Sequence, residues 1–201
     1  MKINETSLSF LSRDCIQQFG AEKGAALFQM TEKAYQELLH HTDDRGSSVI
    51  RDHLQQNLLP PLAYYRTLRA QGFSQEQALK YVRQETRKAA AVKKDRMNSL
   101  ARLPFAYTFY RMGVKKYMRQ NFPNEGWQTE WVRRDRREIH FNLHRCLYRD
   151  ITTEYGCPEL CCVYCENDDI AFSGLLPKIR FQRTGTLAGG APCCDFHFIR
   201  E

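Results

Sequence analysis

No long hydrophobic stretch interrupts this sequence. Its apolar runs all fall short of the roughly 20 residues that a membrane-spanning helix needs, and residues 1–10 lack the basic segment and apolar run of a secretory signal. Internal repeats and low-complexity linkers are absent as well. These absences predict a cytoplasmic protein with no membrane partner, folded as a single domain over residues 1–201, a length that allows a substantial core.

No RNA- or DNA-binding motif accompanies the basic residues. The 30 lysines and arginines outnumber the 23 acidic residues and give a formal net charge of +7. Much of the excess lies in two clusters, residues 83–96 and 133–137, and acidic residues are interspersed among the basic ones. This pattern favours solvated helix faces over a nucleic-acid surface, with attraction of a small anionic substrate as a further role. We therefore predict no nucleic-acid partner.

The cysteines are unevenly distributed, because seven of the eight lie after residue 145. In a cytoplasmic protein they are expected to be reduced thiols rather than disulfides. The skew separates a mainly helical part, residues 1–122, from a cysteine-bearing part of sheet and helix, residues 123–201.

Helical periodicity dominates the first part. Helices are predicted for residues 23–41, a short segment ended by Pro60-Pro61, residues 62–71, residues 74–100 and residues 105–121. Ser74 and Gln77 form a capping-box pattern at the start of the longest of them. The packed stripe of the last helix is predicted to comprise Ala106, Phe109, Met112 and Gly113.

The second part changes to a period of two. Residues 138–148 alternate, with Ile139, Phe141 and Leu143 on one face and His140, Asn142, His144 and Cys146 on the other. A helix over residues 157–172 and strands over residues 178–187 and 193–200 are predicted to follow. This order predicts an α+β fold, with a helical N-terminal half and a C-terminal antiparallel sheet on which a central helix packs.

The cysteine-rich segment raises the question of a metal site. Cys162 and Cys165 form a C-x-x-C pair, but it lies inside the predicted helix, and no second pair follows. Cys193 and Cys194 are adjacent, so they would point to opposite faces of a strand. A dithiol redox site is disfavoured because no thioredoxin-like strand and helix precede the pair. We predict no metal and no cofactor, and keep a zinc-stabilised interaction module as an alternative.

Three thiols with polar neighbours, those of Cys165, Cys146 and Cys194, remain candidate catalytic groups. Cys161, Cys165 and Asp168 share one face of the predicted helix by i, i+4 and i+3 spacing. Cys146 follows His144 in the first predicted strand, and Cys194 precedes Asp195 in the last. The other cysteines, Cys161 among them, are expected to pack as small apolar side chains.

The order and spacing of several segments resemble the L-2-amino-thiazoline-4-carboxylic acid hydrolase family. These segments are P-F at residues 104–105, F-P-N-E-G-W at 122–127, F-N-L-H-R-C-L-Y at 141–148, E-Y-G-C-P-E-L-C-C-V-Y-C-E-N-D-D at 154–169 and R-T-G-T-L-A-G-G-A-P-C-C-D-F-H-F at 183–198. The most specific is the terminal G-x-x-x-C-D-F, from Gly190 to Phe196. The resemblance implies hydrolytic opening of a 2-aminothiazoline ring to an N-carbamoyl-cysteine.

Such a ring opening needs a nucleophile, a partner for the amidine nitrogens and a cation for the substrate carboxylate. Cys165 or Cys194 is the predicted nucleophile, while Asp168 and Asp195 are predicted to orient the amidine group or act as a base. Arg183 is the best-placed partner for the carboxylate.

Three further residues, Cys146, Glu159 and His144, are predicted to line the same pocket. The expected partner is a small molecule with carboxylate and amidine groups, and homo-oligomerisation is left open. A small-molecule-binding, sensor-like domain without turnover is the alternative that the same residues allow.

Overall fold

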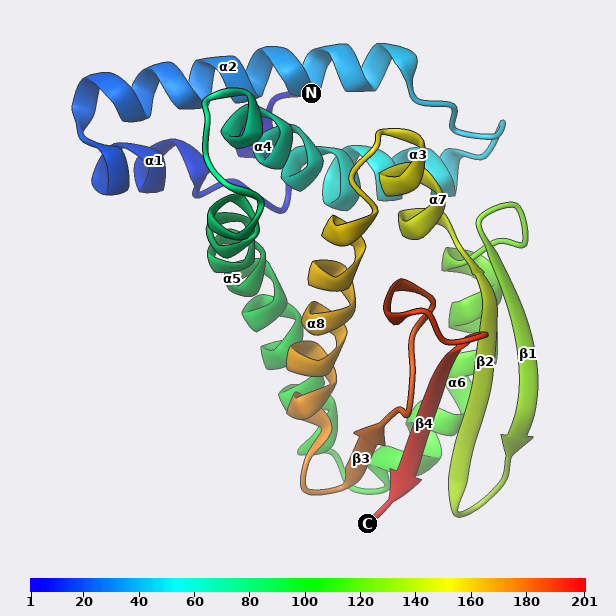
Figure 1. Cartoon of the computed structure of the whole chain (residues 1–201). Coiled ribbons are helices and arrows are strands. Elements are labelled where there is room, and N and C mark those ends of the chain that lie inside the picture. Colours follow the sequence, from blue (N-terminus) through cyan, green and yellow to red (C-terminus); the bar gives the residue numbers. More distant parts are fainter. The chain divides into compact units, whose positions relative to one another are not determined.

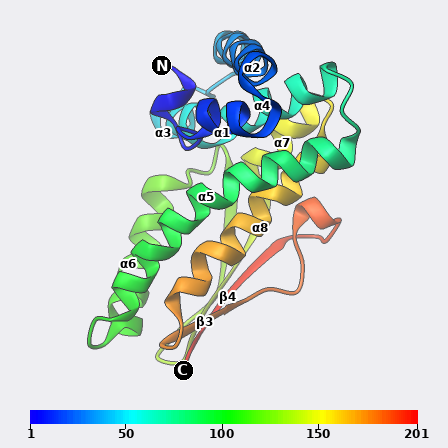
Figure 2. The same ribbon diagram turned by 90° about the vertical axis from the view of Figure 1, so that its left-hand side faces the viewer.

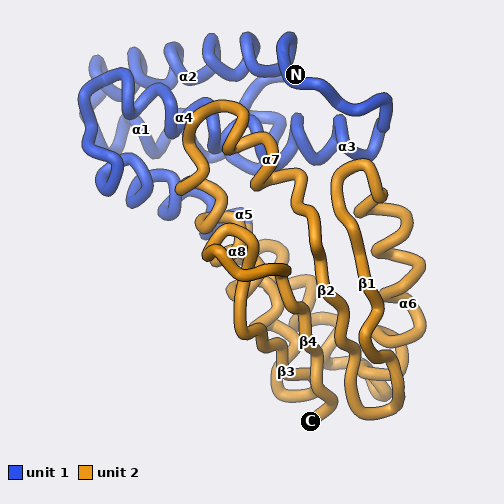
Figure 3. Tube along the Cα trace, turned by 45° about the vertical axis from the view of Figure 1, so that its right-hand side comes forward, with its two compact units in different colours: residues 1–89 blue, residues 90–201 orange.

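Helices form the N-terminal half of the chain and an antiparallel sheet forms near its C-terminus, which confirms the predicted α+β class (Figure 1). The computed structural model describes residues 1–201, in two compact units, Met1–Ala89 and Ala90–Glu201 (Figure 3). No helix is both long enough and apolar enough to cross a bilayer.

The first unit consists of helices. They are α1 (Leu11–Phe19), α2 (Ala21–His41), α3 (Ser48–His53), α4 (Leu59–Ala70) and the start of α5 (Gln75–Ala101), with a 3₁₀ turn η1 (Ile3–Glu5) and a π-helical turn η2 (Leu54–Leu58). Helix α2 lies close against α1 at Gly24, where a Cβ atom would come within 2.3 Å of the Cys15 carbonyl oxygen. A glycine is therefore required at this crossing.

The capping box at the start of α5 is confirmed, whereas the predicted helix end at Pro60-Pro61 is wrong. The Gln77 amide donates to Ser74 Oγ at 3.1 Å, and the Ser74 amide donates to Gln77 Oε1 at 2.9 Å. Pro60 and Pro61 lie in the first turn of α4, directly after the π-helical turn. Proline is tolerated there because the first amides of a helix have no intrahelical acceptor.

A partly buried ion network joins α1 to α5 within the first unit. Lys88 Nζ lies 2.7 Å from Asp14 Oδ2 and 2.9 Å from Glu85 Oε1, and the Glu85 side chain is buried. Burial raises the pKa of Glu85, and the Lys88 ammonium acts against that rise. The network thus keeps a buried carboxylate next to a cation.

The second unit holds the sheet and the remaining helices. In chain order they are α6 (Ala106–Asn121), β1 (Trp127–Arg134), β2 (Glu138–Cys146), α7 (Leu147–Glu154), η3 (Pro158–Leu160), α8 (Cys161–Phe172), η4 (Ser173–Leu175), β3 (Ile179–Gln182), η5 (Leu187–Gly189) and β4 (Cys194–Arg200). The strand order is β1-β2-β4-β3, and all neighbours are antiparallel. Strand β1 and helix α7 had no sequence prediction.

Helices α6 and α8 cover the same face of the sheet (Figure 2). The Phe198 ring on β4 lies 5.1 Å from the Tyr110 ring of α6 and 5.0 Å from the Phe172 ring of α8. Phe141 and Phe196 stack on the same face with ring centroids 5.2 Å apart. An aromatic core therefore fixes α8 against β4.

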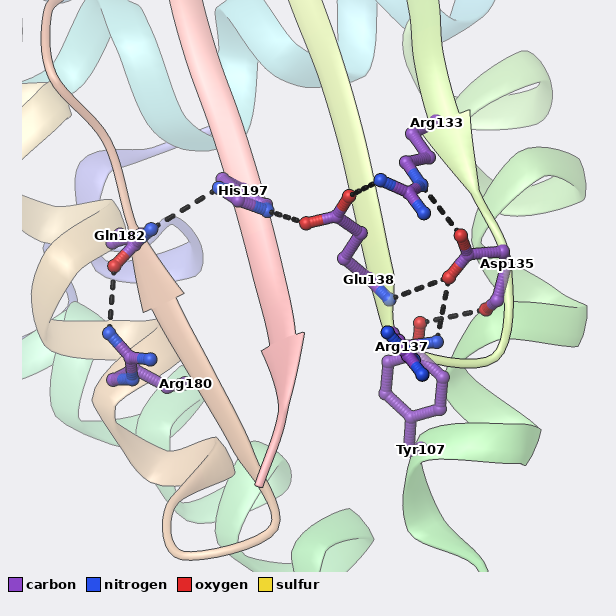
Figure 4. Close-up of polar contacts among 8 residues, drawn as sticks. All are labelled: Tyr107, Arg133, Asp135, Arg137, Glu138, Arg180, Gln182 and His197. Carbon is purple, nitrogen blue, oxygen red and sulfur yellow. Dashed lines mark hydrogen bonds and ion pairs between the residues drawn. The ribbon is translucent and has the colours of Figure 1, made fainter.

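The opposite face of the sheet is polar. His197 Nε2 lies 2.7 Å from Glu138 Oε2, and Arg133 Nη1 lies 2.8 Å from Glu138 Oε1 (Figure 4). The His197 ring stacks on His140 of the neighbouring strand, with centroids 4.9 Å apart. Histidine and carboxylate side chains thus form a cross-strand network there, as the period of two predicts.

The predicted packed stripe of α6 is wrong except at Ala106. Phe109 and Met112 are 52% and 67% exposed, and the buried positions are Ala106, Tyr107, Val114 and Met118. Tyrosines explain the error, because Tyr107 is buried with its hydroxyl donating to the Asp135 carbonyl at 2.9 Å. An amphipathic ring can face a core while its hydroxyl finds an acceptor.

A β-bulge changes the direction of the side chains at the end of β2. Thr129 pairs with Leu143 but Gln128 pairs with Arg145, so His144 is an extra residue without an opposite partner. After the bulge, Cys146 pairs with the buried Trp127 and faces the helices, while His144 Nε2 lies 2.7 Å from Glu130 Oε2. The expectation that His144 and Cys146 share a face is therefore wrong.

Candidate functional site

Three thiols from β2 and α8 meet under the sheet. The Cys161 thiol lies close enough to both Cys146 and Cys165 to interact with each of them. Cys161 and Cys165 are one helical turn apart on α8, and the bulge in β2 turns Cys146 toward them. Cys194, the first residue of β4, is close enough to interact electrostatically with Cys146 and Cys165. We call Cys146, Cys161, Cys165 and Cys194 the thiol cluster.

The thiols of the cluster differ in acidity. Interaction with the Cys161 thiol lowers the pKa of Cys165 and of Cys146, and burial acts in the opposite direction. The same two interactions, together with burial, raise the pKa of Cys161. Cys165 and Cys146 are therefore the thiols of the cluster that ionise more readily.

Cys194 is the least reactive member of the cluster. Its side chain is 5% exposed, and its sulfur accepts a hydrogen bond from the Leu187 amide at 3.1 Å. Burial raises the pKa of this thiol to about 12. At neutral pH it is protonated and shielded, which are the properties of a packing cysteine.

Asp168 follows Cys165 on the same face of α8. Its side chain remains 45% exposed, yet the protein around it removes enough solvent to raise its pKa to about 6. Arg183 and Lys93 act against this rise. A carboxyl group with such a pKa changes its charge near neutral pH, as general acids and bases in enzymes do.

Arg183 joins the segment after β3 to α8. Its Nη2 donates to Asp169 Oδ2 at 2.8 Å and to the Cys165 carbonyl, and its guanidinium lies 5.7 Å from the Phe181 ring centroid. Nη1 lies 3.8 Å from Asp168 Oδ2, which is ion-pair distance but too long for a hydrogen bond. The side chain is 9% exposed and Nη1 is buried without a hydrogen-bond partner. Such an orphaned donor is rare in a folded protein.

Asp195 points away from the thiol cluster, because it neighbours Cys194 on a strand. Its carboxylate accepts hydrogen bonds from the Thr184 amide at 2.8 Å, the Thr184 hydroxyl at 2.9 Å and the Gly185 amide at 2.8 Å. Burial opposes ionisation here, but these hydrogen bonds hold the pKa of Asp195 below its usual range. Asp195 therefore holds the loop that begins at Thr184 and Gly185 in place.

These contacts explain the G-x-x-x-C-D-F segment. Gly190 has a φ of +85°, in the left-handed region that favours glycine, and ends the turn η5. The Cys194 sulfur and the Asp195 carboxylate then hold the two sides of the loop at Leu187 and Thr184. The segment therefore shapes the loop of residues 184–191.

A recess of about 820 Å³ lies against this loop, which we call the loop recess. Asp169 and Arg183 form part of its lining, and the remaining lining residues are Gln182, Thr184, Gly185, Thr186, Gly189, Gly190 and Ala191. Arg183 thus contacts the recess, Asp169 and the backbone of Cys165. The volume is in the range of small-molecule sites.

The structure brings together Cys146, Cys165, Asp168 and Arg183, with Cys194 beside them as a buried thiol. His144 lies on the opposite face of the sheet, and Glu159 lies in η3, ahead of α8. Cys161 was expected only to pack, although its i, i+4 spacing to Cys165 was a visible signal of its part in the cluster. Asp169, which binds Arg183, had no predicted role.

No group of three or more His, Cys, Asp and Glu side chains in the chain has the arrangement of a metal site. Within the C-x-x-C pair, the Cys162 thiol donates to the Glu159 carbonyl at 2.9 Å, while Cys165 belongs to the thiol cluster. The Cys162 hydrogen bond is local to the helix and is of a kind that forms without a bound metal or ligand.

Comparison with known families supports the resemblance read from the sequence. The family model described as L-2-amino-thiazoline-4-carboxylic acid hydrolase matches residues 51–198. No curated protein and no solved structure matches the chain. The matched range contains the whole thiol cluster, Asp168, Arg183 and the loop recess.

Proposed function

Because the chain belongs to the L-2-amino-thiazoline-4-carboxylic acid hydrolase family, we propose that it hydrolyses a small cyclic amidine or isothiourea such as 2-aminothiazoline-4-carboxylate. The family name describes a hydrolase. The observation that carries the proposal is the convergence of an acidified thiol, Cys165, with the Asp168 carboxyl and the buried Arg183 guanidinium.

Cys165 is the nucleophile in this proposal, in preference to Cys194. The contact with Cys161 favours the Cys165 thiolate, whereas Cys194 is buried and its pKa is raised to about 12. Thiolate attack forms a bond to the ring carbon between the nitrogens and the sulfur, and the bond from that carbon to the ring sulfur breaks. Water then adds to the same carbon, Cys165 leaves as a thiol, and the carbon becomes the carbonyl of N-carbamoyl-cysteine.

Asp168 has two tasks in this reaction. As a carboxylate it pairs with the amidine nitrogens and holds the ring carbon near Cys165, one helical turn away. Because its pKa is about 6, it is largely ionised at neutral pH and can still accept a proton from the attacking water and pass it on.

Arg183 is the partner of the substrate carboxylate. Its Nη1 is a buried donor without a hydrogen-bond partner, and its side chain contributes to the lining of the loop recess. A carboxylate bound at Nη1 would satisfy this donor and place the substrate beside Asp168, whose Oδ2 lies 3.8 Å from Nη1.

The test is ring opening by Cys165→Ser, followed as the release of new thiol from 2-aminothiazoline-4-carboxylate. We expect a loss on the order of a thousandfold or more, as for removal of a catalytic nucleophile. Cys162→Ser, on the same helix, and Cys194→Ser are the matched controls and should keep most of the activity.

Other outcomes would contradict the role of Cys165 or the hydrolysis itself. Full activity in folded Cys165→Ser would remove the thiol mechanism, and loss confined to Cys194→Ser would transfer the role to that residue. If the wild-type protein bound the compound without releasing thiol, it would be a small-molecule-binding domain rather than a hydrolase.

A further inference from the structure

A second recess, of about 400 Å³, lies between α6 and β1 and shares no residue with the loop recess or the thiol cluster. We call it the basic recess. Its charged lining consists of Lys115, Lys116 and Arg119 on α6 and Arg134 on β1, and no acidic residue lines it. Like charges held together repel one another, which is unfavourable unless an anion neutralises them.

Several cations elsewhere in this unit have acidic partners. Arg133, the neighbour of Arg134, bridges Asp135 at 2.6 Å and Glu138 at 2.8 Å on the polar face of the sheet (Figure 4). Arg145 and Arg183 likewise pair with Asp150 and Asp169. The cations of the basic recess form no such ion pair, so their charge is available to a ligand.

Arg134 is held in position for binding. Its Nη1 donates to the Arg111 carbonyl of α6 at 2.9 Å, which fixes the guanidinium across the recess. The helix dipole accounts for basic residues near the C-terminal end of α6, such as Arg119, but not for an arginine that a strand directs toward the same place. A fixed guanidinium offers paired N–H groups that match a phosphate.

The recess also has apolar walls. The half-buried Trp131 ring and the exposed Met112 belong to its lining. A ring of this kind offers a surface on which a flat heterocycle can stack. A volume of about 400 Å³ suits a small molecule rather than a folded partner or a long peptide.

We propose that the basic recess binds a nucleoside phosphate, with the phosphates against Arg134 and the lysines and the base against Trp131. The proposal is independent of the ring-opening reaction, because it concerns other residues and binding rather than turnover.

The experiment is a calorimetric titration of the full chain with ADP, with inorganic phosphate and adenosine as separate arms. ADP should bind more tightly than either, because only ADP engages both the cations and the ring. Arg134→Gln and Lys115→Gln should each weaken ADP binding about tenfold or more, the usual effect of losing a charge-assisted hydrogen bond. Arg136→Gln removes the same charge from the exposed turn after β1 and should have little effect.

Several results would overturn the proposal. These are no ADP binding at millimolar concentration, equal binding by the wild type and the Arg134→Gln and Lys115→Gln variants, or binding of a single-stranded oligonucleotide but not of ADP. Lys115 is exposed on α6, so its variant keeps the test informative if Arg134→Gln fails to fold. Phosphate binding as tight as that of ADP would reject the role of Trp131 and with it the nucleoside.

Discussion

At the scale of single residues, Asp168 has the environment of a functional rather than a stabilising group. Its pKa in the folded chain is about 6, above the value of about 3.9 expected for an aspartate in the unfolded chain. The folded state therefore binds the proton more tightly, and the free energy of unfolding falls as the pH rises from about 4 to about 6. The fold is more stable with this carboxyl group neutral.

The raised pKa of Asp168 predicts how Asp168→Asn changes the free energy of unfolding. At pH 7 the variant should be at least as stable as the wild type, and the difference should vanish below about pH 4, where both side chains are neutral. Urea unfolding at several pH values measures it. Asp169→Asn, which loses the 2.8 Å pair with Arg183, is the matched control and should gain nothing. A less stable Asp168→Asn at pH 7 would make the carboxylate structural.

The sequence could indicate that Cys165 and Asp168 act together, because helical spacing places them on one face of α8. It could not indicate the direction of Cys146. That direction depends on an extra residue in β2, which is defined only by the pairing with β1. Strand β1 escaped prediction because it is an edge strand with exposed residues at most positions, so it has no clear apolar alternation.

At the scale of elements, the loop of residues 184–191 depends on Asp195. Asp195→Asn keeps one acceptor oxygen but loses the charge that holds the Thr184 and Gly185 amides. We expect a loss of about 1–2 kcal/mol in the free energy of unfolding and a rise in KM larger than the fall in kcat. Steady-state ring-opening kinetics check this. A fall in kcat of several orders of magnitude, with an unchanged KM, would show that Asp195 acts on the reaction itself.

The helices also have features that the sequence alone does not predict. The predicted bounds of α6, residues 105–121, are close to the observed ones. Its predicted buried face is wrong, because Tyr107 is buried whereas Phe109 and Met112, which were expected to pack, are exposed. The local sequence does not predict the π-helical turn before Pro60 either, since packing against neighbouring helices decides whether a proline ends a helix or begins its next turn.

At the scale of the whole molecule, an excess of seven positive charges coexists with a buried carboxylate, that of Glu85. Lys88→Met should lower the free energy of unfolding by about 1–3 kcal/mol at neutral pH, a value reduced from that of a fully buried pair because Lys88 is partly exposed. The loss should shrink as the pH falls through the raised pKa of Glu85, because protonated Glu85 needs no cation, whereas Asp14, whose pKa is lowered, stays charged at pH 4.5.

Thermal unfolding at pH 7 and pH 4.5 tests the Lys88 prediction. Lys80→Met, on the exposed side of the same helix, is its control. An equal loss at both pH values would show that Lys88 acts through packing rather than charge.

The bulge at His144 has a consequence for how this chain can change. Since its role in β2 is to stand unpaired, the chemical nature of position 144 matters less to the thiol cluster than its lack of a partner on β1. Removal of one residue between Leu143 and Cys146 would make the pairing regular and leave the thiol opposite Trp127, whereas one residue inserted between Gln128 and Thr129 would pair with His144 and turn the thiol from the helices to the solvent. The number of residues in β1 at this point is thus under tighter constraint than the identity of residue 144.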